Sequence, residues 1–219
     1  MIITSRDGLG ALIKIMQEAA VTRDGLVEQA ERPCDHLSMT AIEQSTLETA
    51  RLRLRPLVMT DAVALNVIQS DPVHMRFYPH PFSLDESREW IERMRERRER
   101  DGFSLLAVED RETGEFLGNV GPILQHVDGV DEVELGWSIT PARARQGIAT
   151  EAALACRDWA FAALPSDHLI SLILPANVPS RGVAEHIGMT VWKDVMWGVE
   201  KPQLHFVYRV DRPAEASVS

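Results

Sequence analysis

Residues 141–161, PARARQGIATEAALACRDWAF, form a short basic loop around Gly147 that runs directly into an alanine-rich segment. Before the loop, residues 131–139, DEVELGWSI, alternate between polar and apolar side chains, which is typical of a strand. The sequence therefore predicts a strand, a glycine turn and a helix that begins near Gly147. Such a junction points free backbone N–H groups and the positive end of the helix dipole at one spot, which suits phosphate or pyrophosphate.

The residue types in the loop agree with this interpretation. Gly147 allows a ligand to approach the backbone without a Cβ in the way, and Arg143 and Arg145 add donors that suit phosphate oxygens. A Walker-type loop and a dinucleotide fingerprint are both excluded, because the additional glycines that they need are missing. Taken alone, the segment is equally compatible with an ordinary strand–helix connection that carries two solvated arginines.

Composition sets the broad class. The chain has 219 residues, of which 45% are hydrophobic and 26% are charged, as expected for one soluble globular domain with an appendage. A net charge of −10 argues against a general nucleic-acid-binding protein and weakly favours a cationic or amine substrate. The sequence shows no membrane-spanning run and no signal peptide, so we expect a cytoplasmic protein.

Cysteine and histidine usage argues against two further classes. The two cysteines, Cys34 and Cys156, are too few for a disulfide framework, and Cys156 is expected to be a small buried residue among alanines. The seven histidines are scattered without the spacing of metal ligands, so no metal site is predicted.

The chain divides into three regions by pattern. Residues 1–48 contain a predicted amphipathic helix at about 9–21 but no recognisable chemistry, and they are either a packing or oligomerisation element or an extension. The sequence therefore leaves open whether the protein forms a homodimer. Residues 49–211 have a regular pattern and form the predicted domain, and residues 212–219 are expected to be a loose tail.

Within the domain, the predicted order is strand, two helices, three antiparallel strands, helix, strand, helix and two strands. Ser83 and Glu86 form a capping box at the start of the second helix. The predicted elements lie at about 51–57, 60–69, 83–100, 103–109, 116–125, 131–139, 147–164, 168–174, 179–187, 191–197 and 205–210.

This order, together with residues 143–153 and 177–189, resembles the GNAT superfamily of acyl-CoA N-acyltransferases. The stretches ETARLRLRP (48–56), RFY (76–78) and ELGW (134–137) are most similar to the Rim-type branch, which acetylates N-termini of ribosomal proteins. The resemblance covers about residues 48–210. It implies a mixed α/β fold with a mostly antiparallel twisted sheet of six to seven strands, flanked by helices and containing a splayed strand pair. It also implies direct transfer of acetyl from acetyl-CoA to a primary amine, either a protein N-terminus or a small amine.

The resemblance also implies where acetyl-CoA binds. The pantetheine arm would lie beside the strand end at Trp137, Ser138 and Ile139, and Asn177 and Ser180 would lie near the thiol. The loop that would hold the pyrophosphate consists of Arg143, Arg145, Gln146, Gly147, Ile148, Ala149 and Thr150.

Two positions depart from the family pattern. Ala144 stands where the family usually has Gln or Arg, three residues before the central glycine. Ala184 stands where many relatives have a tyrosine that acts as general acid. Ser180 is therefore our candidate to protonate the departing thiolate. These departures also favour an alternative, a non-catalytic CoA-binding or regulatory protein of the same fold.

Glu134 is the predicted general base. An amine must lose a proton before it attacks a thioester, and strand alternation places Glu132, Glu134, Gly136 and Ser138 on one face, opposite an apolar face. Glu132 and His186 are weaker candidates, and a merely solvated Glu134 is the alternative. We expect an acceptor site built from Phe77, Tyr78 and Trp90, with Trp192 and Trp197 nearby, although core packing would explain each aromatic residue equally well.

Overall fold

The computed structural model describes residues 46–198 and 202–214. The helix predicted at about 9–21, and Cys34, lie outside these residues. No helix in the described part of the chain is both long enough and apolar enough to cross a membrane.

The described residues form an eight-stranded sheet in the order β1-β2-β3-β4-β5-β6-β8-β7. Every neighbouring pair is antiparallel except β5 and β6, which are parallel. The predicted mixed fold with a mostly antiparallel sheet is confirmed, and the two-residue β1 is a strand that the sequence did not indicate. The elements are β1 (Leu47–Glu48), β2 (Leu52–Pro56), η2 (Met59–Asp61), α2 (Ala62–Gln69), η3 (His74–Phe77), α3 (Leu84–Asp101), β3 (Leu106–Asp110), β4 (Phe116–Val127), β5 (Val130–Ile139), η4 (Pro141–Arg143), α4 (Ile148–Ala163), β6 (His168–Ile173), α5 (Val178–His186), β7 (Thr190–Trp197) and β8 (Gln203–Asp211).

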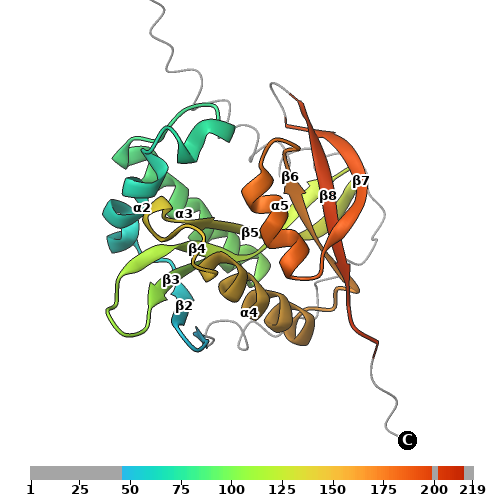
Figure 1. Ribbon diagram of the computed structural model, residues 1–219, viewed down its shortest axis with the longest axis horizontal. Coiled ribbons are helices and arrows are strands. Elements are labelled where there is room, and N and C mark those ends of the chain that lie inside the picture. The colour runs from blue at the N-terminus through green and yellow to red at the C-terminus, as the bar shows by residue number, and fades with distance from the viewer. Residues whose placement is uncertain (1–45, 199–201, 215–219) are drawn as a thin grey trace, which may run out of the picture.

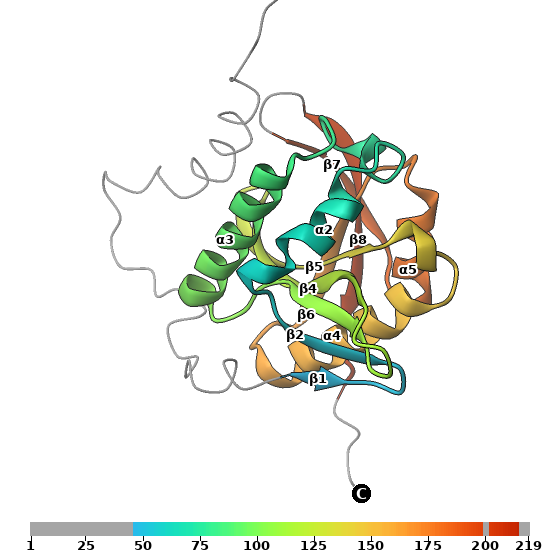
Figure 2. The same cartoon turned by 90° about the vertical axis from the view of Figure 1, so that its left-hand side faces the viewer.

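Helices cover both faces of the sheet. Helices α4 and α5 lie on one face, and α2 and α3 lie on the other (Figures 1 and 2). Alternation along β3 shows the division, because Leu106 and Val108 belong to the core under α4, whereas Ala107 belongs to the cluster under α2 and α3. Cys156 of α4 is fully buried in the first of these cores, as predicted.

The central pair β4–β5 depends on one glycine. Gly118 has a φ of 143°, and a Cβ at this position would lie 2.1 Å from the carbonyl oxygen of Ser138 on β5. Only glycine permits this approach, which holds the end of β5 close to β4.

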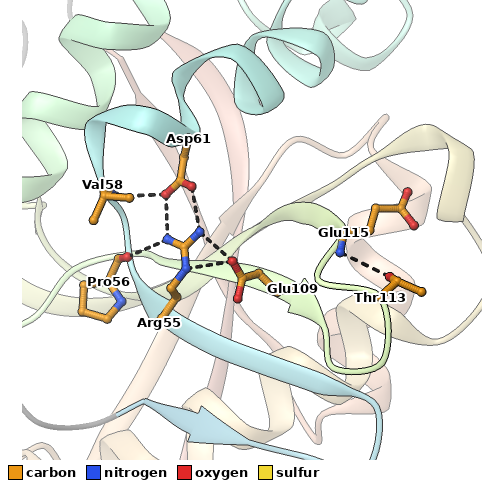
Figure 3. Close-up of polar contacts among 7 residues, drawn as sticks. All are labelled: Arg55, Pro56, Val58, Asp61, Glu109, Thr113 and Glu115. Atoms are coloured by element: carbon orange, nitrogen blue, oxygen red, sulfur yellow. Dashed lines mark hydrogen bonds and ion pairs between the residues drawn. The ribbon is translucent and has the colours of Figure 1, made fainter.

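A salt-bridge network fastens the start of α2 to the sheet (Figure 3). The Arg55 guanidinium on β2 donates to both carboxylate oxygens of Asp61, over 2.8 and 2.7 Å, and to Glu109 of β3 over 2.8 Å. Asp61 is buried and also accepts from the backbone N–H of Val58. The hydrogen bond to Asp61, together with the other contacts to these carboxylates, outweighs burial and raises the pKa of Arg55. The bidentate geometry therefore fixes the helix relative to β2 and β3.

Candidate active site

The parallel pair β5–β6 opens shortly after it begins. Among the described residues, its ladder contains a single register pair, Glu134 opposite Ile170, although both strands continue beyond it. Strand β5 runs on to Ile139 on the β4 side, and β6 continues to Ile173 on the β8 side. The predicted splayed pair is thus present, with Glu134 where the pairing ends.

Side chains replace the ladder at this point, which we call the fork (Glu134, Leu135, Ser171 and Leu172). The Leu172 backbone N–H donates to Glu134 Oε1 over 3.3 Å, and the Ser171 hydroxyl donates to the Leu135 carbonyl over 2.6 Å. Each strand thus satisfies a backbone group of its neighbour with a side chain. The strands can therefore part without leaving these two backbone groups unpaired.

The environment of Glu134 suits a group that takes up a proton near neutral pH. Burial raises the pKa of Glu134 from its ordinary value of 4.5 to about 7, and the effect is partly offset by the Leu172 N–H, the charge of Arg97 and the side chain of Gln125. Glu134 is nevertheless only partly buried. A base is most effective when its pKa lies near the working pH.

The predicted faces of β5 are confirmed by the packing. Leu135 belongs to the core under α4, and Val133, Trp137 and Ile139 pack against that core. The Trp137 and Ile139 side chains are therefore turned toward the core. Ser138 lies on the opposite face, where its hydroxyl is 2.8 Å from His74 Nε2.

The loop before α4 has the conformation of an anion-binding turn. Arg145 and Gly147 both adopt left-handed backbone conformations, with φ values of 61° and 77°. No side chain of the described residues caps the start of α4 at Gly147, and Gly147 is exposed. Left-handed residues next to an uncapped helix start direct backbone N–H groups into a concavity that attracts anions.

Hydrogen bonds from Arg51 and Thr49 support this loop, and the sequence did not predict them. Arg51 donates to the Gln146 carbonyl over 3.0 Å and, through Nε, to Glu151 of α4 over 2.7 Å. Thr49 donates to the same Glu151 carboxylate over 2.5 Å. The carbonyl of Gln146 is thus turned toward Arg51, and Arg51 connects the loop to the first turn of the helix.

The structure assigns local roles to several predicted cofactor-site residues. Ile148 is buried and anchors the helix, while Ala149 and Thr150 form its partly buried first turn. Arg143 forms an ion pair with Glu115 at the start of β4.

Beyond β6, the Asn177 side chain caps α5 by accepting from the Ser180 N–H over 3.3 Å. Ser180 is therefore in the first turn of the helix that follows the fork, and its hydroxyl has no partner among the described residues. Ala184 is fully buried in the core, and an alanine has no proton to donate.

Two apolar clusters flank the face that carries Glu134. Trp90 packs against the cluster under α2 and α3, and Trp197 packs with Leu172 against the cluster around β6–β8. Burial, followed by the charge of Glu134, raises the pKa of Tyr78. Solvent nonetheless reaches 53% of Tyr78, and Phe77 beside it is stacked under the Arg76 guanidinium. Whether Phe77, Tyr78 and Trp90 bind an acceptor stays a prediction.

Three weaker candidates lie elsewhere. Glu132 is paired with His168 over 2.8 Å at the beginning of β5 and β6, the end away from the opening. Trp192 lies against the same His168, with ring centroids 6.1 Å apart. His186 is exposed on α5 and bonded to its own helix. In the described part of the chain, no group of three or more His, Cys, Asp or Glu residues could hold a metal ion.

Sequence reasoning missed His74, Arg97, Ser171 and the Arg51–Glu151 pair. Ser171 alone carried a signal, because it is the one polar residue within the apolar run 169–174. The others act through partners distant in sequence.

Comparisons with known proteins agree on one family. Residues 51–190, more than half of the chain, match the acetyltransferase (GNAT) domain profile. The uncharacterised protein YkkB of Bacillus subtilis is 33% identical over 153 residues, which are 69% of this chain and 89% of YkkB. An acetyltransferase structure from Agrobacterium tumefaciens is 31% identical, with a TM-score of 0.65 over 86% of this chain and 98% of that one. RimJ of Mycobacterium smegmatis, solved with CoA-disulfide, shares the fold at 20% identity and a TM-score of 0.58, over 73% of this chain and 81% of RimJ. The chain therefore belongs to the GNAT acetyltransferase family and is an acyl-CoA N-acetyltransferase.

Proposed function

We propose that the protein transfers the acetyl group of acetyl-CoA directly to a primary amine, with Glu134 as general base. The observation that carries this proposal is the position of Glu134 at the fork, with a pKa of about 7. A group of this kind, placed where two strands separate, is suited to take a proton from an amine beside a thioester.

The proposed binding mode of acetyl-CoA uses the two openings described above. Backbone N–H groups at the start of α4 would hold the pyrophosphate, supported by Arg145 and Gln146 of the loop. The pantetheine arm would lie along β5 at residues 137–139, where no pairing with β6 is present in the described chain. Because Arg143 is paired with Glu115, we give it a lesser share of the phosphate contacts.

The proposed chemistry moves one proton at each end of the reaction. Glu134 takes a proton from the acceptor ammonium, and the neutral nitrogen attacks the thioester carbonyl carbon. The new C–N bond gives a tetrahedral intermediate, whose negative oxygen is stabilised by a backbone N–H of β5, and the C–S bond then breaks as the carbonyl re-forms. The Ser180 hydroxyl is the proposed donor of a proton to the departing thiolate, and it regains a proton from the nitrogen, which loses its second proton to become an amide.

We propose Phe77, Tyr78 and Trp90 as the acceptor side of the site. Protein N-termini and small amines both fit this proposal. It also includes a cytoplasmic location and a homodimer, which cell fractionation and light scattering would test.

The decisive experiment measures thiol release from acetyl-CoA with a panel of N-terminal peptides and small amines. Wild-type protein should release thiol with at least one acceptor class, and Glu134→Gln should not. A pure, folded sample that neither binds acetyl-CoA nor releases thiol would contradict the proposal.

A second candidate is a non-catalytic CoA-binding protein, favoured by Ala144 and by the buried Ala184. It would bind CoA tightly, acetylate no acceptor and be indifferent to Glu134→Gln. Measurable transfer that depends on Glu134 would exclude it.

A further inference from the structure

The segment between α2 and α3 is fastened to β5 by one side-chain hydrogen bond. His74 Nε2, at the start of η3, lies 2.8 Å from the hydroxyl of Ser138. Ser138 shares its strand face with Glu134, in the part of β5 that does not pair with β6 among the described residues. The bond therefore joins the proposed acceptor loop to the strand that would present the thioester.

Backbone hydrogen bonds close the turn that contains His74 and ends at Tyr78, and the His74 N–H itself donates to Asp71 Oδ1 over 3.3 Å. The Met75 N–H donates to the Asp71 carbonyl over 2.9 Å, and the Tyr78 N–H donates to the Met75 carbonyl over 2.8 Å. Met75 is buried, which seats this single turn in the protein interior. A constraint on His74 is thus passed to Tyr78 through one turn of 3-10 helix.

The imidazole of His74 is suited to a permanent contact. Its surroundings contain Asp71 and Arg76, whose charges act in opposite directions, and burial has the largest effect, so the pKa of His74 is lowered. The ring is therefore neutral at physiological pH, and it can form one defined hydrogen bond with the serine hydroxyl.

We propose that His74 is a positioning residue, which fastens the turn that ends at Tyr78 to Ser138, on the strand face that carries Glu134, and so defines where the acceptor nitrogen binds. This inference rests on the proposed function and deepens it. The neutral Tyr78 hydroxyl accepts a hydrogen bond from the acceptor ammonium while Glu134 receives the proton. Acetyl-CoA does not need the His74–Ser138 bond, because its proposed contacts with β5 are with backbone groups.

The test combines four variants, His74→Ala, Ser138→Ala, their double mutant and His74→Gln, whose amide can restore the bond. His80→Ala is the matched control, because His80 is an exposed histidine on the same segment that bonds only near its own position, to Pro81 and Glu86. Hydrogen exchange of residues 74–78 in the protein without substrates is the first measurement. Acceptor KM and the Kd of acetyl-CoA are the second.

We expect exchange at 74–78 to accelerate about 5- to 10-fold in His74→Ala and Ser138→Ala, as for the loss of one hydrogen bond. Acceptor KM should rise by a similar factor in both, while the Kd of acetyl-CoA should be unchanged in His74→Ala, which lies outside the proposed acetyl-CoA site. The double mutant should be no worse than either single variant, because both remove the same bond. His74→Gln should recover most of the loss, and His80→Ala should match wild type.

Unchanged exchange in His74→Ala and Ser138→Ala would overturn the proposal, whether or not an acceptor is known. Faster exchange with an unchanged acceptor KM would also overturn it, because the His74–Ser138 bond would then have a structural role only. If the wild type acetylates no amine, the proposed function fails, and the assignment of Tyr78 to an acceptor fails with it. The exchange data would then still decide whether His74 fixes the loop.

Discussion

Glu134 Oε1 accepts a hydrogen bond from the backbone N–H of Leu172, across the gap between two parallel strands. In an uninterrupted parallel ladder, this N–H would bond to a backbone carbonyl of β5. Here a carboxylate takes the place of the carbonyl, so one residue both ends the pairing and stands at the opening. The position of the proposed base and the opening of the strands are thus one structural feature.

Removing the proposed base should abolish transfer while leaving donor binding intact. Glu134→Gln keeps the shape and can still accept from Leu172, but it cannot take up a proton. We expect kcat/KM to fall about 10²- to 10⁴-fold, the usual contribution of general base catalysis. In the wild type, kcat/KM should rise with pH up to about 7, and the variant should lack this limb. Equal activity of the two proteins would assign the base elsewhere.

The same substitution should stabilise the fold at alkaline pH. The folded-state pKa of Glu134, about 7, lies above its ordinary value of 4.5, so the folded protein favours the protonated form. Wild-type stability should therefore decline as pH rises from 4.5 to 7 and stay reduced above it. At pH 8 we expect Glu134→Gln to be more stable by about 1 to 3 kcal/mol, and at pH 4 equal. Urea titrations at both pH values measure the difference, and a constant offset would refute the assignment.

Gly147 should matter for the donor as well as for the backbone. Alanine in this left-handed conformation costs about 1 to 2 kcal/mol, and its Cβ would lie 3.5 Å from the Arg51 guanidinium, which supports the loop of the proposed pyrophosphate site. Gly114→Ala is the control, because Gly114 has a similar φ of 73° and open space around it. Both variants should lose similar stability, and only Gly147→Ala should weaken acetyl-CoA binding, by about tenfold or more. Calorimetry measures both quantities.

The serine at the fork should be costly to remove. Ser171→Ala leaves the Leu135 carbonyl without its side-chain donor, and we expect a loss of about 1 to 3 kcal/mol. Ser104 offers a matched control, since it is equally buried but its hydroxyl has no partner in the described structure. Ser104→Ala should change the free energy of unfolding by less than about 0.5 kcal/mol. If both variants lost similar free energy of unfolding, the bond from Ser171 to the Leu135 carbonyl would not be what stabilises the fold here.

The network around Asp61 should stabilise the fold more than an exposed ion pair does. Asp61→Ala leaves Arg55 with Glu109 alone and removes the acceptor of the Val58 N–H, so we expect a loss of about 2 kcal/mol or more. Asp158→Ala, which removes an exposed pair with Arg157, should cost less than about 1 kcal/mol. Chemical denaturation of both variants provides the comparison.

Local patterns were sufficient for the elements and for the face that each residue occupies. Alternation along residues 131–139 placed Glu134 and Ser138 opposite Leu135, and the packing confirms this. The capping box of Ser83 and Glu86 is also present as predicted. The strand predicted at 103–109 instead begins at Leu106, because strand limits depend on where the neighbouring strand pairs.

The sequence by itself determined the order of elements, the burial of their apolar faces and the glycine-to-helix junction before α4, because periodicity and backbone conformation are local properties. Only the tertiary structure decided the contacts that assemble the site. The hydrogen bonds between Glu134 and Leu172, between His74 and Ser138 and between Arg51 and Glu151 join residues that are 38, 64 and 100 positions apart in the chain. Such contacts depend on strand register and helix placement, which many distant side chains set together and which no local pattern specifies.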